Sequence, residues 1–241
     1  MLPNLAVGVP YALIMLVAVF VSWYLNRKMQ QRLPLGRRER LGIALGAFCG
    51  SMIGAKIPYL LADWEGMLSG RAWFADGKTI LFGMVGGYFG VEIAKAILDV
   101  RIKTGDSFVV PVAVGIAIGR LACFQVGCCY GTPTSLPWGV VFHDTIPRHP
   151  TQLYETAFHL VAAAILWEFR RRQLFRGQLI KLYFLAYFAY RFATEWIRPE
   201  PRFWPGLTAY QWSAVLFSIL FAGLWYVDAQ RPLTDGPGAA E

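Results

Sequence analysis

The sequence predicts an all-α membrane protein, a polytopic bundle of seven transmembrane helices. Of its 241 residues, 56% are apolar and 16% are charged, whereas an average soluble domain is about 45–50% apolar and about 25% charged. The apolar residues are also gathered into long runs, and a helix needs about 20 such residues to cross a bilayer. These observations argue against a water-soluble globule and against intrinsic disorder.

We interpret each long apolar run as one transmembrane helix. The runs lie at about 5–25, 41–61, 79–98, 108–124, 151–167, 178–197 and 207–227. The chain is therefore expected to form a single integral membrane domain over 1–231. Residues 232–241 are expected to form a short flexible cytoplasmic tail.

The distribution of basic residues predicts the orientation in the membrane. Six basic residues follow the first run closely: Arg27, Lys28, Arg32, Arg37, Arg38 and Arg40. By the positive-inside rule this loop is cytoplasmic, so the N-terminus is outside and, after seven crossings, the C-terminus is inside. The net charge of +8 is then explained mostly by short cytoplasmic loops, and we expect no nucleic-acid partner.

Small residues in the second and third runs predict close helix packing. Gly42, Gly46, Gly50 and Gly54 recur every four residues and share one face of a helix. The third run contains Gly83, Gly86, Gly87 and Gly90. Small residues at such spacing let helix backbones approach closely in lipid.

Polar residues gather between 119 and 155, at the predicted outer end of the fourth run and the start of the fifth. Arg120 lies near the end of an otherwise apolar helix. A charge inside a span is costly and usually functional. The alternative is an arginine that extends to the membrane interface.

A second polar group closes the sixth run, where Tyr187, Arg191, Glu195 and Arg198 can share one helical face. Arg191 and Glu195 are four residues apart and can form an ion pair. Two arginines from different helices suit a phosphate, because the guanidinium group matches phosphate oxygens. A phospholipid headgroup supplies a phosphate at that depth. The alternative is a structural ion pair within the membrane.

The segment RHPTQLYE (148–155) opens the fifth run. Pro150 suits a helix start, where the missing N–H does no harm. Glu155 needs a partner if it is buried, and Arg120, Arg148 and Lys56 are candidates. His149 can act as a base or hold the loop by hydrogen bonds.

Cysteines occupy the same region, and three explanations for them stay open. Cys123, Cys128 and Cys129, with His143 and His149, offer zinc-ligand atoms, but their spacing matches no usual zinc motif. A disulfide from Cys123 to Cys128 or Cys129 is the second explanation. Small apolar lining of a lipid cavity is the third.

Three motifs carry a resemblance to a known family. They are GR-x-x-x-F-x-x-G-x-x-x-G from Gly119 to Gly131, RHPTQLYE at 148–155 and R-x-x-x-E-x-x-R at 191–198. With weaker matches at Tyr11, Lys56 and Gly86, the chain resembles bacterial prolipoprotein diacylglyceryl transferase over nearly its whole length.

The resemblance implies that a diacylglyceryl group passes from phosphatidylglycerol to a lipoprotein-precursor cysteine at the outer leaflet of the bacterial inner membrane. It implies that Arg120 and Arg191 hold the phosphate, with Glu195 and Arg198 in support. His149 is our first choice for the base, and we expect no cofactor and no metal. The other residues predicted to bind the phospholipid are Tyr11, Lys56, Gly86, Gly87, Gln152, Tyr154, Glu155 and Tyr187.

The sequence departs from the family pattern at four positions. Cys123, Val126 and Cys128 stand where the family has two Asn and a Glu, and Val85 replaces a His often regarded as the base. The acceptor is therefore either a lipoprotein thiol or another periplasmic nucleophile. The alternative function is a related membrane protein that binds or translocates an anionic phospholipid; Glu92 and Lys95 would be its translocation pair or a simple ion pair.

Overall fold

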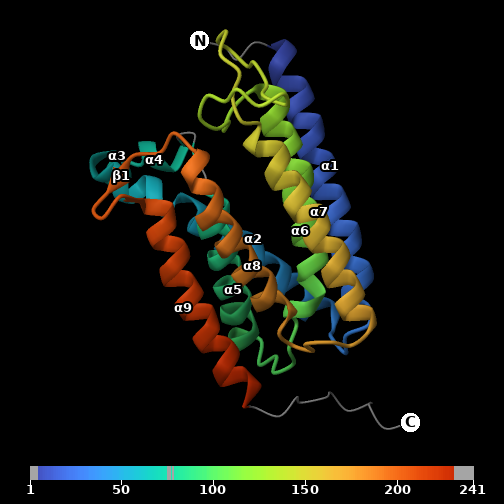
Figure 1. The fold of residues 1–241 in the computed structure, drawn as a ribbon. Coiled ribbons are helices and arrows are strands. Elements are labelled where there is room, and N and C mark those ends of the chain that lie inside the picture. Colours follow the sequence, from blue (N-terminus) through green and yellow to red (C-terminus); the bar gives the residue numbers. More distant parts are fainter. Residues whose placement is uncertain (1–4, 75–76, 78, 231–241) are drawn as a thin grey trace. The chain divides into compact units, whose positions relative to one another are not determined.

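The computed structural model describes residues 5–74, 77 and 79–230. One long helix covers each predicted run (Figure 1): α1 (Leu5–Gln30), α2 (Arg37–Ala62), α5 (Ile80–Ile97), α6 (Gly105–Val126), α7 (Thr151–Arg171), α8 (Leu179–Thr194) and α9 (Ala209–Ala229). The short elements are α3 (Trp64–Leu68), α4 (Arg71–Phe74), the 3-10 helix η1 (Glu195–Ile197) and an antiparallel pair of strands, β1 (Arg202–Phe203) and β2 (Leu207–Thr208). The tail predicted at 232–241 lies outside the described residues.

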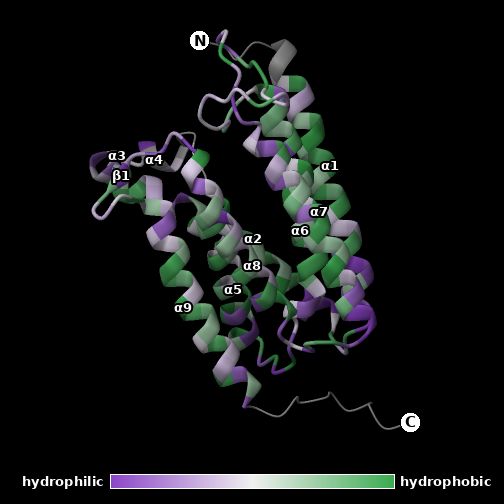
Figure 2. Cartoon of the chain, in the orientation of Figure 1, coloured by the Kyte–Doolittle hydropathy of each residue, from purple (hydrophilic) through white to green (hydrophobic). Residues whose placement is uncertain are grey.

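Five helices of the described residues are long and apolar enough to cross a membrane, namely α1 from Gly8, α2, α5, α6 and α9. Figure 2 shows apolar residues along the length of these helices. Helix α8 has only 16 residues, and α7 contains the buried polar residues Gln152, Glu155 and His159. The structure thus supports a multi-pass membrane protein, while seven crossings and the orientation of the termini stay predictions.

The chain divides into two compact units. Among the described residues, the first comprises 5–32 and 104–229 and contains α1 and α6–α9. In this unit α6 packs against both α1 and α7, and α8 packs against α9. The second contains α2–α5, with residues 33–103, and its main contact joins α2 and α5. All the buried charged residues described below as a site belong to the first unit.

Glycines bring the backbones of α2 and α5 into direct contact, as their spacing predicts. A Cβ atom on Gly50 would lie 2.9 Å from the Cα of Gly90, and one on Gly54 would lie 2.9 Å from the Cα of Gly86. Glu92 and Lys95 of α5 form a local ion pair at 3.0 Å. Packing of the second unit thus requires glycine at several facing positions.

We expect Gly50→Ala to destabilise the protein by about 1–3 kcal/mol, because the added methyl group forces two packed backbones apart. Gly223→Ala in α9 is the matched control, since a Cβ there meets nothing within 4 Å. Thermal unfolding in detergent measures the difference. Equal midpoints for the two variants would contradict the close packing of α2 and α5.

Side chains of α6 and α9 hold the start of α8 in place. Asp106, in the first turn of α6, accepts hydrogen bonds from the backbone N–H groups of Gly177 and Leu179 at 2.6 and 3.0 Å. Lys181 forms an ion pair with Asp228 of α9 at 2.6 Å. These contacts fix the start of α8, and with it the register of the polar residues further along this helix.

Candidate functional site

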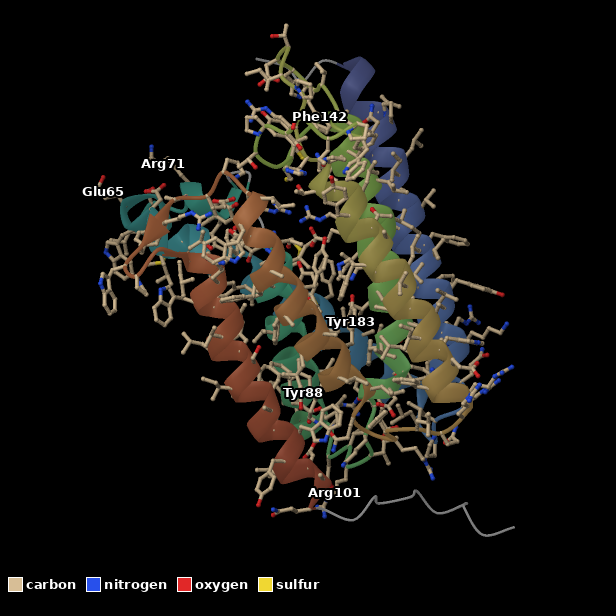
Figure 3. All side chains as sticks on the ribbon, viewed as in Figure 1. Glu65, Arg71, Tyr88, Arg101, Phe142 and Tyr183 are labelled. Carbon is tan, nitrogen blue, oxygen red and sulfur yellow. The ribbon has the colours of Figure 1, made fainter. Side chains whose placement is uncertain are left out.

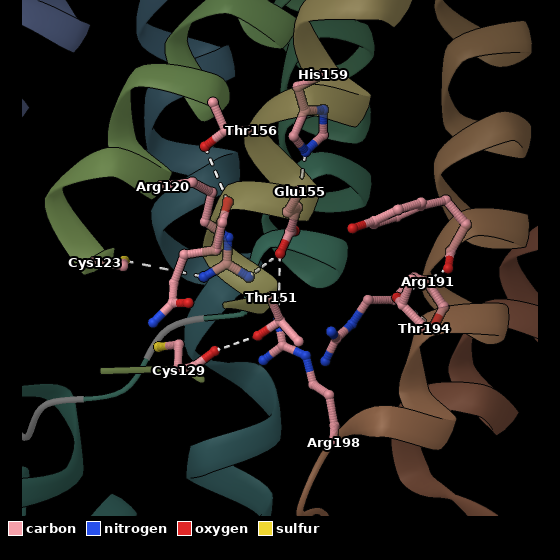
Figure 4. A network of polar contacts seen from close by, with 12 residues as sticks. Arg120, Cys123, Cys129, Thr151, Glu155, Thr156, His159, Arg191, Thr194 and Arg198 are labelled. Carbon is pink, nitrogen blue, oxygen red and sulfur yellow. Dashed lines mark hydrogen bonds and ion pairs between the residues drawn. The ribbon is translucent and has the colours of Figure 1, made fainter. Parts of the chain in front are cut away.

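Glu155 of α7 is the centre of a buried polar network (Figure 4). Its carboxylate is 1% exposed and pairs with Arg120 of α6. It also accepts hydrogen bonds from the Tyr187 hydroxyl at 2.6 Å and from Nη2 of Arg198 at 3.3 Å. Of the candidate partners predicted for Glu155, the structure therefore brings Arg120 to it, and it adds Arg198. Three elements far apart in sequence meet at one carboxylate.

Arg148, another candidate partner, instead donates two hydrogen bonds to Oδ2 of Asp144, at 3.0 and 2.7 Å. These bonds hold the pKa of the Asp144 carboxyl below its usual value. Both residues lie in the loop between α6 and α7. Arg148, one of the three candidates for Glu155, therefore has a different partner, because a carboxylate in the same loop binds its guanidinium group.

Arg191 contributes a second ion pair, with Glu195 at 2.9 Å, as its spacing predicts. Its guanidinium carbon also lies 4.8 Å from the centre of the Tyr210 ring. Both side chains of the ion pair are buried, at 6% and 0% exposed. Arg191 is thus held from two sides, by a carboxylate of its own segment and by an aromatic ring of α9.

The prediction that one helical face carries Tyr187 through Arg198 is wrong at its end. Helix α8 ends at Thr194, a 3-10 turn follows, and Arg198 is extended, with φ −109° and ψ 146°. Pro199 follows directly, and the residue before a proline is disfavoured in helical conformation. The side chain of Arg198 reaches Glu155 from this extended segment.

The network carries more positive than negative charge. Three buried guanidinium groups face two carboxylates, those of Glu155 and Glu195. Among the described residues, Nε of Arg120, Nη1 of Arg191 and Nε of Arg198 are buried without a hydrogen-bond partner. The same holds for both carboxylate oxygens of Glu195 and for Oε1 of Gln152. Buried polar groups normally have partners. An anion with several oxygen atoms, such as a phosphate, would accept hydrogen bonds from the unpaired guanidinium N–H groups and balance the excess charge.

The loop after α6 is folded against the start of α7. Helix α6 ends at Gly127, whose φ of +73° is left-handed and favours glycine. Gly131 donates to the carbonyl of His149 at 2.8 Å, and a Cβ on it would lie 2.8 Å from the Cβ of His149. Thr132 donates to the carbonyl of Ile197 at 2.8 Å. The glycines of the first motif therefore close this loop beside Arg120.

The segment 148–155 begins α7 and anchors the same loop. Pro150 is the N-cap residue of α7, so the predicted helix start is confirmed. Thr151 Oγ1 and Gln152 Nε2 donate to the carbonyls of Cys129 and Cys128, at 2.7 and 2.5 Å. Gln152 thus has a structural partner, and its predicted contact with phospholipid stays a prediction.

His149 and Tyr154 lie together at the edge of this loop. Nδ1 of His149 is 3.3 Å from the hydroxyl oxygen of Tyr154, which also accepts a hydrogen bond from Trp138 at 2.8 Å. This contact orients the imidazole ring of His149, which is compatible with both roles predicted for it, a base and a residue that holds the loop by hydrogen bonds. Its action as a base stays a prediction.

Two residues that were not predicted from the sequence, His159 and Tyr183, extend the network towards the middle of the helices. The Tyr183 hydroxyl is 2.8 Å from Nδ1 of His159, and Nε2 of His159 is 3.9 Å from Oε1 of Glu155. Tyr183 projects from α8 (Figure 3) and is fully buried. The missed signal is helical spacing, since His159 is four residues after Glu155 and Tyr183 is four before Tyr187.

The other residues predicted to bind the phospholipid belong to α1 and to the second unit. Tyr11 is in α1 of the first unit and is 38% exposed. Lys56, Val85, Gly86 and Gly87 belong to the second unit, where Gly86 contacts α2 as described. Close packing explains Gly86, and a role of these residues in lipid binding stays a prediction.

These features define a helical membrane protein with a buried, arginine-rich polar site. Residues 2–227 match the family model of prolipoprotein diacylglyceryl transferase. The chain therefore belongs to this family of membrane enzymes.

Individual relatives agree with the family model. The chain is 31% identical to a phosphatidylglycerol–prolipoprotein diacylglyceryl transferase of Bordetella parapertussis, over 80% of this chain and 76% of the relative. It is 29% identical to the enzymes with that name from Clostridium tetani, over 80% and 81% of the two chains, and from Nitratidesulfovibrio vulgaris, over 95% and 92%. The similarity thus covers most of each relative.

Proposed function

We propose that this protein transfers a diacylglyceryl group from phosphatidylglycerol to the cysteine thiol of a lipoprotein precursor. The names of the relatives support the donor and the acceptor. The observation in the structure that supports the proposal most directly is the excess of buried guanidinium donors around Glu155 and Glu195.

The reaction is a displacement at a carbon atom of the glycerol that carries the acyl chains. The thiol sulfur forms a bond to this carbon, the bond from the carbon to the phosphate oxygen breaks, and glycerol phosphate leaves with the electron pair. Negative charge on the leaving phosphate grows in the transition state. Donors that are fixed in advance and shielded from water stabilise such charge.

In the proposed site, Arg120 and Arg191 bind the phosphate and Arg198 assists them. Glu155 positions Arg120 and Arg198, and Glu195 positions Arg191, through the ion pairs described above. Tyr187 completes the environment of Glu155. His149 is the proposed base for the thiol.

We further propose that the chain forms a single membrane domain with seven crossings in the bacterial inner membrane. The N-terminus lies outside, so the site faces the outer leaflet. Five helices of the described residues support spanning by their length and composition. The basic residues after α1 support the orientation.

Purified protein in detergent, supplied with phosphatidylglycerol and a lipobox peptide, tests the function. We expect release of glycerol phosphate and an equal amount of peptide that has gained a diacylglyceryl group. Arg171→Ala, at an exposed position of α7, is the control and should be fully active. Release without modified peptide would contradict the proposed acceptor. Bound lipid with no release, whichever acceptor is supplied, would contradict an enzyme and favour the lipid-binding alternative.

A further inference from the structure

Three thiols converge beside the proposed phosphate site. The sulfur atoms of Cys123, Cys128 and Cys129 all lie within 4.8 Å of one another. Cys123 belongs to the last turn of α6, and the other two follow Gly127. The spacing along the chain indicated no zinc motif, but the left-handed turn at Gly127 reverses the chain and brings Cys128 back to Cys123. The backbone N–H of Cys128 donates to the carbonyl of Cys123 at 3.1 Å.

The backbone around these thiols is held by the start of α7. The hydrogen bonds from Gln152 and Thr151 described above fix the carbonyls of Cys128 and Cys129. Figure 4 shows Thr151 and Cys129 joined in this way, with Cys123 facing Arg120. Sites that bind a metal need ligands oriented by such surrounding contacts. The cluster is therefore positioned by the same segment that supplies Glu155.

The arrangement of these three cysteines does not suit a disulfide. Adjacent residues such as Cys128 and Cys129 have Cα atoms about 3.8 Å apart, below the range of about 4.4–6.8 Å found in disulfides. A bridge from Cys123 to either one leaves the third thiol unpaired. Zinc uses all three, because zinc–sulfur bonds of about 2.3 Å in tetrahedral geometry place sulfur atoms about 3.8 Å apart.

The geometry points to a zinc site formed by Cys123, Cys128 and Cys129, whose fourth position takes the thiol of the acceptor. Three protein ligands and one open position are typical of catalytic zinc. Three thiolates and Zn²⁺ leave one negative charge, and Arg120 lies beside it, with Nη1 at 4.0 Å from the sulfur of Cys123. The inference rests on the proposed function, because it assigns the activation of that acceptor.

Zinc would activate the acceptor thiol. A thiol that coordinates zinc gives up its proton readily; it would pass the proton to the proposed base, His149, and become a nucleophile. This thiolate attacks the glycerol carbon, and the phosphate at Arg120 departs as described under Proposed function.

The first test is metal content. The full-length protein, purified in detergent under reducing conditions, is incubated with zinc, dialysed and analysed by elemental mass spectrometry. We expect one zinc per chain in the protein and in Cys49→Ser, the control from the second unit, and none in Cys129→Ser. A reduced protein that retains no zinc would overturn the site, and so would full zinc content in Cys129→Ser.

The second test uses Co²⁺ in place of zinc, because its visible absorption reports the ligands. A lipobox peptide should change the spectrum of the cobalt protein, while the same peptide with Ser in place of Cys should not. Identical spectra with and without the Cys peptide would overturn the binding of the acceptor thiol.

Activity of the zinc-free protein separates this inference from the proposed function. Full transfer after removal of zinc by a chelator would overturn the role of zinc and leave the transferase intact. A zinc-loaded protein without any transfer would overturn the proposed function. The metal site would then still be supported by the measured zinc content and by the spectrum of the cobalt protein.

Discussion

Arg191→Ala is expected to lower the rate of diacylglyceryl transfer by about 10²–10³-fold, the effect of removing one fixed donor for developing negative charge. Arg191 is the strongest choice because its Nη1 is buried without a partner among the described residues. Its removal leaves the buried carboxylate of Glu195 without its ion-pair partner, at a cost of about 3–5 kcal/mol. Activity is therefore compared below the unfolding midpoint of the variant.

Arg120→Ala should reduce the rate to a similar extent. The measurement for both variants is single-turnover release of glycerol phosphate, with thermal unfolding as the check on folding. Arg191→Lys is the informative companion, because a lysine keeps the charge but loses the planar pair of donors. Full activity of either alanine variant would contradict the assignment of phosphate binding to these arginines.

Glu155→Ala should have the largest effect on stability. The carboxylate is 1% exposed and pairs with Arg120 and Arg198, so its removal leaves two buried positive charges near each other. Breaking a buried ion pair by removing one partner costs about 3–5 kcal/mol. The midpoint of thermal unfolding in detergent should therefore fall strongly.

Glu168→Ala is the matched control, since Glu168 belongs to the same helix and pairs with the exposed Arg171 and Arg172. Exposed pairs contribute little, so this midpoint should hardly change. If Glu155→Ala were as stable as Glu168→Ala, Glu155 would not hold the arginines together.

The sequence predicted the helices well because their signal is local. Apolar runs of sufficient length and the four-residue spacing of Gly46, Gly50 and Gly54 arise within single helices. The same holds for the pair Arg191–Glu195, which is four residues apart on one helical turn. Helical geometry alone brings such residues together.

The assembly of the site depends on contacts that no local pattern encodes. Glu155 had three candidate partners, and the choice depended on how the loop after α6 folds and on Asp144 taking Arg148. Arg198 reaches Glu155 only because α8 ends before Pro199.

The cysteines illustrate the same limit. Their spacing along the chain resembled no zinc motif, yet a left-handed turn at Gly127 and two side chains of α7 gather them. Turns of this kind decide which distant residues become neighbours. Sequence spacing alone therefore does not show that these three thiols lie close together.

Binding of phosphatidylglycerol, compared with binding of diacylglycerol that lacks the phosphate, tests the central claim most directly. Both lipids are titrated into the detergent-purified protein and into Arg191→Ala, and bound lipid is counted by native mass spectrometry. If the buried arginines bind the phosphate, the protein prefers phosphatidylglycerol, and Arg191→Ala loses most of that preference while binding diacylglycerol as before. An undiminished preference in Arg191→Ala would contradict the claim.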